Sequence, residues 1–282
     1  MNTLKTGLLL AVLTLILVVG GQAFGGQQGM ALALVIAVVM NFAAYFWSDK
    51  IALAMSGARL VTPQQAPQLY ALVEGLCARA GLPVPRLYVI PQMQPNAFAT
   101  GRDPHHAAVA VTQGLLETMT RDELEGVIAH ELSHVKNRDT LIMAVAATLA
   151  GAITYLAHVA RWGLLFTGYG GRDRDGGGNA LSALLMIILA PLAALLIQLA
   201  ISRQREYAAD AGAAKMAGHP FGLVQALEKL GHYAKRVPMR GVEPATAHLY
   251  IVNPFSGGAL AGLFSTHPPL EERIQRLKSL TA

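Results

Sequence analysis

The sequence predicts an α+β fold, mainly α, in which four membrane-spanning helices accompany a polar part on one side of the bilayer. Hydrophobic residues make up 53% of the 282 residues. Asp, Glu, Lys and Arg together make up 14%, whereas a soluble domain averages roughly 25%. These four residue types are missing from three stretches, 6–48, 140–160 and 176–202, each of membrane-spanning length.

The charge balance is basic, with 22 Lys and Arg against 17 Asp and Glu. Nucleic acid is not the expected partner, because the basic residues flank the apolar runs instead of forming a stripe with interleaved aromatic residues. The single cysteine, Cys77, excludes a disulfide framework or a cysteine-rich zinc module. Any metal must therefore be held by histidines and carboxylates.

The first uncharged stretch divides into two apolar runs, about 4–19 and about 30–47. Residues 20–29 between them are so rich in glycine and polar side chains that we expect the helix to end there. The first run is short for a span. It also fits a cleaved signal peptide, in which Lys5 is the basic start and residues 21–23 form a small-residue cleavage site.

Two later runs, from 141 to about 166 and from about 181 to 201, complete the four predicted spans. Lys and Arg are concentrated beside the large polar segments and are few in the outer turns, so the positive-inside rule places those segments in the cytoplasm. The predicted organisation is two spans in 1–48, a polar segment in 49–139, two spans in 140–201 and a second polar segment in 202–282.

The polar segments predict a small α/β unit followed by further helices. Apolar residues at helical spacing indicate helices, and short runs bounded by proline and glycine indicate strands. The predicted elements are a helix at 67–80, strands at 86–90, 96–100 and 107–112, and helices at 221–235 and 270–280.

A capping box at Thr120 and Glu123 predicts the start of a helix that contains His130, Glu131 and His134. Histidines at i and i+4 project from one face, so both imidazoles can reach one Zn²⁺ ion at roughly 2.0 to 2.1 Å. The intervening glutamate is then placed to act as general base on a water at the metal. The alternative is two surface histidines that share a helix face.

The third zinc ligand must come from another segment, since Asn137 and Thr140 stand where metzincins have glycine and histidine. Glu206 is the best candidate, and a glutamate ligand makes the site gluzincin-type; its alternative is an ion pair with a nearby arginine. Asp210, one turn later, can accept the outer N–H of a ligand histidine. Asp139 either orients the metal helix or simply precedes the third span. The two intervening spans return the chain to the face that it left, which brings both motifs together.

The chain resembles the HtpX family of bacterial membrane zinc proteases, which are relatives of the CAAX prenyl proteases. The resemblance covers nearly the whole chain and rests on the apolar spans and on motifs at 96–101, 130–134, 206–210 and 265–269. It implies a heat-shock-associated inner-membrane endopeptidase that degrades damaged or misassembled membrane proteins, with its active site facing the cytosol. We therefore expect a cytoplasmic gluzincin-type zinc metalloprotease domain with one Zn²⁺ ion per chain, and self-cleavage among its reactions.

Two further groups of residues complete the expected site. His267 and Arg273, which match the family's carboxyl-terminal motif, are candidates to hold the developing oxyanion. His267 has two alternatives, a helix N-terminal residue or a resting-state zinc ligand. Substrate is expected to add as a strand beside an edge strand containing Asn96, Ala97 and Phe98, for which an ordinary hairpin strand is the alternative.

Three other functions compete with a quality-control protease: a scaffold, a transporter and a processing protease. A scaffold that keeps zinc for structure does not need the general base Glu131. A transporter needs more ionisable residues within its spans than this sequence has. A processing protease with one defined peptide substrate stays within the same enzyme class, although four spans leave little room for an enclosed chamber, which favours a broader substrate range.

Overall fold

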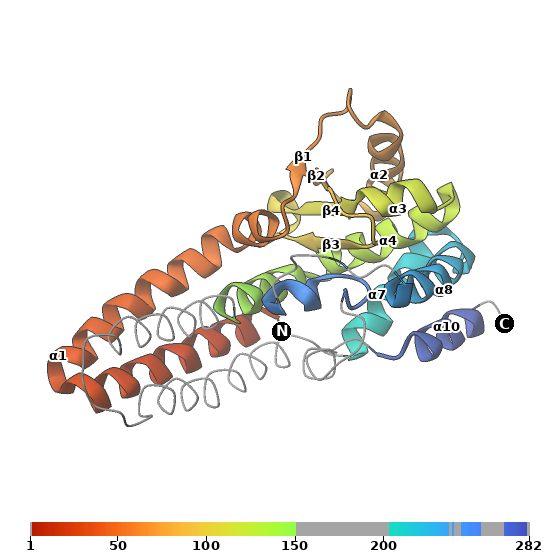
Figure 1. Cartoon of the computed structure of the whole chain (residues 1–282). Coiled ribbons are helices and arrows are strands. Elements are labelled where there is room, and N and C mark those ends of the chain that lie inside the picture. The colour runs from red at the N-terminus through yellow and green to blue at the C-terminus, as the bar shows by residue number, and fades with distance from the viewer. Residues whose placement is uncertain (1, 151–202, 237–238, 240–243, 255–267, 281–282) are drawn as a thin grey trace, which may run out of the picture.

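The fold consists of a long helical hairpin and a small sheet surrounded by helices (Figure 1). The computed structural model describes residues 2–150, 203–236, 239, 244–254 and 268–280. Most described residues are helical, as predicted. The labelled elements are α1 (Asn2–Met55), β1 (Arg59–Leu60), α2 (Pro67–Ala80), β2 (Arg86–Ile90), β3 (Ala97–Thr100), η1 (Pro104–His106), β4 (Ala108–Thr112), α3 (Gln113–Thr118), α4 (Arg121–Asn137), α7 (Arg203–Ala217), α8 (Phe221–Arg236), η2 (Pro244–Leu249) and α10 (Leu270–Ser279).

The two halves of α1 fold back on each other at Gly26, which has φ 56° and ψ −146° (Figure 1). A Cβ atom on Gly21 would lie 2.4 Å from the Gly29 carbonyl oxygen, so the halves touch through their backbones. The predicted break is confirmed, but the expectation that the whole glycine-rich run leaves the helix is wrong. The small residues instead permit this close packing, while helical hydrogen bonds keep the backbone satisfied.

One helix among the described residues is long and apolar enough to cross a membrane, Gly26–Met55, with a mean hydropathy of 2.1. Only 11% of its most apolar window is buried, so its side chains are not those of a soluble core helix. The predicted third span begins in the structure as a shorter apolar helix, Thr140–Ala150. Its continuation and the whole predicted fourth span fall in 151–202, outside the described residues, and the number of four spans stays a prediction.

The sheet has the strand order β1-β2-β4-β3, in which β2 and β4 are parallel and the other two pairs are antiparallel. The three predicted strands are confirmed, whereas the two-residue strand β1 was not predicted. The central strand β4 is buried on both faces. Val109 and Val111 pack with α2, α4 and α8, while Ala108 and Ala110 pack with the end of α1 and with the helix Thr140–Ala150. The sheet therefore joins the apolar helices to the helices that hold the candidate site.

Helix α4 begins at the predicted capping box. The Glu123 backbone N–H donates to Thr120 Oγ1, and the Thr120 backbone N–H donates to a Glu123 carboxylate oxygen. Lys229 Nζ on α8 donates to the same carboxylate at 2.7 Å. Burial raises the pKa of Glu123, but the bonds from Lys229 and Thr120 outweigh it and hold the pKa below its ordinary value. The start of the metal helix is thus tied to α8.

Replacing Glu123 with Gln keeps an acceptor for the Thr120 N–H but removes the charge that pairs with Lys229. The free energy of unfolding at neutral pH should fall by about 1 kcal/mol. A carboxyl whose pKa is depressed by folding stabilises the fold above its unfolded-state pKa, and this contribution is lost as pH falls through its folded-state pKa. The difference between wild type and variant should therefore shrink towards zero below about pH 4. Denaturation at several pH values measures it. Glu117→Gln, at an exposed position on α3, is the control, and a pH-independent difference would contradict the assignment.

Candidate metal centre

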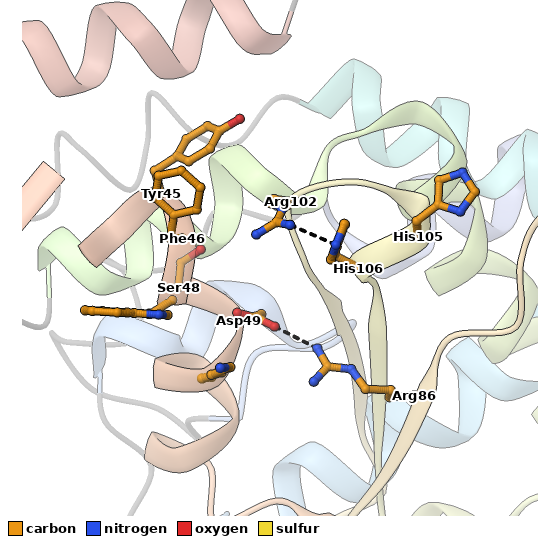
Figure 2. A pocket seen from close by; sticks show the side chains of 10 residues that line it. Tyr45, Phe46, Ser48, Asp49, Arg86, Arg102, His105 and His106 are labelled. Atoms are coloured by element: carbon orange, nitrogen blue, oxygen red, sulfur yellow. Dashed lines mark hydrogen bonds and ion pairs between the residues drawn. The ribbon is translucent and has the colours of Figure 1, made fainter. Parts of the chain in front are cut away.

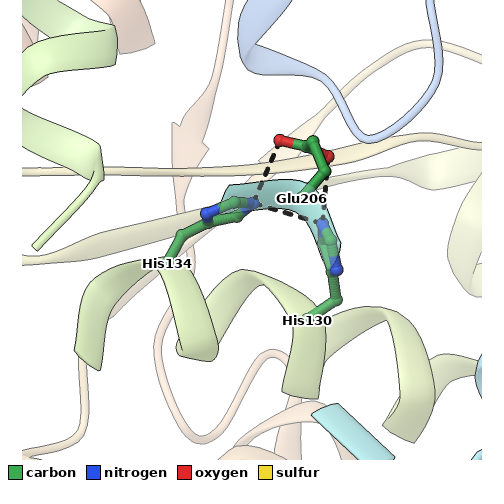
Figure 3. Close-up of side chains that lie close together, drawn as sticks. All are labelled: His130, His134 and Glu206. Carbon is green, nitrogen blue, oxygen red and sulfur yellow. Dashed lines mark hydrogen bonds and ion pairs between the residues drawn. The ribbon is translucent and has the colours of Figure 1, made fainter. Parts of the chain in front are cut away.

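His130 and His134 lie one turn apart on α4, and their imidazole rings converge on the same side of the helix (Figure 3). Their side chains are 1% and 4% exposed. The two Nε2 atoms are 3.2 Å apart. The local spacing alone accounts for this pair, because residues four apart share a helix face.

Glu206 comes from α7, which lies against α4 and brings its carboxylate over the two imidazoles (Figure 3). Its oxygens lie 3.8 Å from His130 Nε2 and 3.6 Å from His134 Nε2. Gly212 allows the close approach of the two helices, since a Cβ atom there would lie 2.7 Å from Ser133 Oγ. One ligand atom from each of the three residues lies within 4.8 Å of the others, as the sequence interpretation requires.

The outer nitrogen of each imidazole faces a buried aspartate. His130 Nδ1 lies 3.0 Å from Asp210 Oδ1, and His134 Nδ1 lies 3.1 Å from Asp139 Oδ2. An ionised carboxylate only accepts hydrogen bonds, so each Nδ1 carries an N–H, and in the neutral form of each imidazole the lone pair is on Nε2. Arg138 adopts a left-handed conformation, with φ 57°, that turns Asp139 back toward His134. Of the two interpretations of Asp139, this geometry fits the one in which it orients the metal helix.

The donor set fits a zinc ion. Two imidazole lone pairs and a carboxylate converge at 3.2 to 3.8 Å, and ligands of a tetrahedral Zn²⁺ ion are roughly 3.3 Å apart. Burial and the charge of Arg273 lower the pKa of His130 to about 4. Burial lowers the pKa of His134, but the bond to Asp139 and the charge of Glu206 raise it to about 8. A cation at this point therefore competes with a proton on His134 at neutral pH.

Arg273 of α10 is fully buried and holds Asp210 in place. Its Nε and Nη2 atoms donate to the two Asp210 oxygens at 2.9 and 2.7 Å, and Nη1 donates to the Ile251 carbonyl at 3.2 Å. Burial raises the pKa of Asp210, yet the charge of Arg273 and the bond to His130 hold it at about 2. The guanidinium also lies 3.4 Å from both ring nitrogens of His130 and 3.8 Å from Glu206 Oε2. It is fully buried and in contact with Asp210, His130 and Glu206, which suits a positioning residue. The other oxyanion candidate, His267, lies outside the described residues.

Glu131 is 1% exposed and lies between α4 and the edge strand β3. The Ala99 backbone N–H donates to Glu131 Oε2 at 2.8 Å. Sequence reasoning did not anticipate this bond, because the two residues lie 32 positions apart. It places the candidate general base beside the edge at which substrate is expected.

The residues expected to bind substrate, Asn96, Ala97 and Phe98, instead contact the segment 250–252 of the same chain. Phe98 is fully buried and packs edge-on against Tyr250, with ring centroids 5.2 Å apart. Asn96 Nδ2 donates to the Val252 carbonyl at 2.8 Å, and the Ile251 N–H donates to the Ala97 carbonyl at 3.0 Å. Part of the β3 edge is therefore covered by the segment 250–252. The apolar run Tyr-Ile-Val is the only signal in the sequence for this contact.

The profile of peptidase family M48 matches residues 63–281. A protease HtpX homolog from Desulfatibacillum aliphaticivorans is 58% identical, covering 98% of this chain and 89% of the relative. One from Syntrophotalea carbinolica is 56% identical, covering 100% and 99%. The crystal structure of S. mikatae Ste24p has a TM-score of 0.52 at 21% identity and covers 94% of this chain. The match spans 62% of that longer chain, and it supports the fold alone.

Proposed function

The chain belongs to peptidase family M48, and from that premise we propose that it is a zinc-dependent endopeptidase of the gluzincin type in the cytoplasmic membrane. The profile match and the HtpX relatives confirm the family resemblance noted from the motifs. The observation that carries the proposal is the convergence of His130, His134 and Glu206 beside the carboxylate of Glu131.

Each residue has a distinct part in the proposed reaction. His130, His134 and Glu206 hold one Zn²⁺ ion, while Asp210 and Asp139 keep the imidazoles in the ligating tautomer. A bound Zn²⁺ ion supplies Lewis acidity, which polarises the scissile carbonyl and lowers the pKa of water. Glu131 accepts the proton of the attacking water and then donates it to the leaving amine.

The proposed substrates are unfolded or misassembled membrane proteins. The outward-facing backbone of β3 can bind an extended chain through main-chain hydrogen bonds, which tolerate many side chains. Because the segment 250–252 covers β3 at Ala97, the substrate strand is proposed to lie toward Ala99, whose N–H is bonded to Glu131 in the structure. Such binding requires a locally unfolded chain, which suits quality control during stress.

Membrane placement is supported by the exposed apolar helix Gly26–Met55. We propose that the spans lie in 1–48 and 140–201, and that the catalytic segments 49–139 and 202–282 face the cytoplasm. The concentration of Lys and Arg beside these segments supports this orientation.

Removal of zinc should abolish proteolysis and restoration should recover it. The full chain, purified in detergent and treated with a chelator, is incubated with an unfolded test protein with and without one equivalent of Zn²⁺, and fragments are followed over time. Zinc-dependent cleavage supports the proposal. Zinc binding without cleavage of unfolded proteins would instead favour the scaffold, and cleavage confined to one defined peptide would favour the processing protease.

A further inference from the structure

A hollow of about 400 Å³ lies where the end of α1 meets the turn between β3 and β4 (Figure 2). Helix α1 contributes residues 45–50, strand β2 contributes Arg86, and the turn between β3 and β4 contributes Arg102, His105 and His106. This interfacial hollow is separate from the metal centre, since it shares no residue with it.

The hollow lies at the level where the apolar helix becomes polar. Phe42, Phe46 and Trp47 are 55%, 41% and 50% exposed, and Asp49 and Lys50 are the first charged residues after the span. Exposed aromatic residues next to charged ones are typical of the boundary between hydrocarbon and water. In the membrane placement proposed above, the hollow therefore lies among the lipid headgroups.

Three permanent cations surround the hollow: Lys50, Arg86 and Arg102. Asp49 binds Arg86 at 2.7 Å (Figure 2). Asp103, just outside the lining, lies 3.6 Å from Arg102 Nε and also binds His106. Three cations against two carboxylates leave one excess positive charge, which matches the single negative charge of a phosphodiester.

The Arg102 side chain is positioned by two contacts and keeps N–H donors with which it can bind an anion. Its Nη2 atom lies 2.8 Å from His106 Nε2 (Figure 2), and its guanidinium carbon lies 5.8 Å from the centroid of the Phe46 ring. A guanidinium has five N–H donors, more than these contacts use. Lys50 on the next turn of α1 is exposed, and its long side chain adds a second mobile cation.

We propose that the interfacial hollow binds the phosphodiester headgroup of an anionic phospholipid, with Arg102 and Lys50 on the phosphate and Trp47 beside the glycerol. Basic pockets beside membrane helices on the cytoplasmic side recognise such headgroups. The proposal depends on the membrane placement and is independent of the peptidase chemistry. The lipid would link the span to the turn that follows the edge strand β3.

Native mass spectrometry of the full chain in neutral detergent tests the proposal, with phosphatidylglycerol and phosphatidylcholine of equal chain length as probes. We expect wild type to retain phosphatidylglycerol preferentially. Lys50→Gln with Arg102→Gln should weaken that retention about 30-fold, because each cation near an anionic lipid is worth about fivefold in affinity. Lys50→Gln alone, which keeps the contacts of Arg102, should weaken it about fivefold.

The control removes the same charges elsewhere, as Arg121→Gln with Lys215→Gln at exposed positions on α4 and α7. Unchanged retention in the first pair, or equal loss in the control pair, would overturn the site. Inorganic phosphate is the second probe: binding of phosphate without preference for phosphatidylglycerol would also overturn the lipid assignment. A chain that needs no detergent would refute the membrane placement itself, whereas loss of proteolysis alone has no bearing on this site.

Discussion

Replacing Glu131 with Gln should lower the rate of peptide hydrolysis by about 10²–10⁴-fold while leaving zinc bound. The amide has nearly the shape of the carboxylate and can still accept the hydrogen bond from the Ala99 backbone at the β3 edge. It cannot take a proton from the attacking water. Fragment formation from an unfolded protein gives the rate, and elemental analysis of the same sample gives the zinc content.

Glu125→Gln is the matched control, because it changes the same side chain on the same helix at a position paired with Arg79 on the outer surface. This variant should cleave at the wild-type rate. If the Glu131 variant keeps full activity, a contaminating protease or a different base is responsible. If it loses zinc as well as activity, the missing metal accounts for the lost activity, and Glu131 is assigned to support of the metal centre.

Replacing Asp210 with Asn should affect both stability and zinc binding. The change removes the nearest carboxylate from the fully buried Arg273 and leaves Glu206, 3.8 Å away, as its remaining ion-pair partner. Breaking a buried ion pair costs about 3–5 kcal/mol of unfolding free energy, and we expect the lower end of that range here. His130 also loses its anionic hydrogen-bond acceptor, so zinc affinity should fall about 10–100-fold. Chemical denaturation measures the first effect, and competition with a chromophoric chelator measures the second.

Two comparison variants separate the effects. Asp139→Asn removes the corresponding acceptor from His134 but leaves the bond between Asp210 and Arg273 intact, so zinc affinity should fall with a smaller loss of stability. In the pair Asp210→Leu with Arg273→Met, the buried charge is removed together with its partner, so stability should recover relative to Asp210→Asn. Equal destabilisation by all three variants would contradict the buried ion pair as the cause.

Most helices and strands followed from local sequence. The capping box at Thr120 and Glu123 and the helical spacing of His130 and His134 involve neighbours in the chain, whose geometry depends on the helix alone. The glycine-rich run predicted a break, but packing decided its extent. Among the described residues only Gly26 leaves the helix, because close contact between the two halves keeps the neighbouring glycines helical.

The sequence by itself determined the family, and it predicted His130, Glu131, His134 and Glu206 as the candidate site. Tertiary structure decided which groups surround them: Arg273 binds Asp210 across 63 positions, and Asn96 binds Val252 across 156. Such pairs leave no periodic signal, because they depend on how closely helices and strands pack. The covered part of the β3 edge and the basic hollow beside α1 became visible only when the folded chain brought these distant segments together.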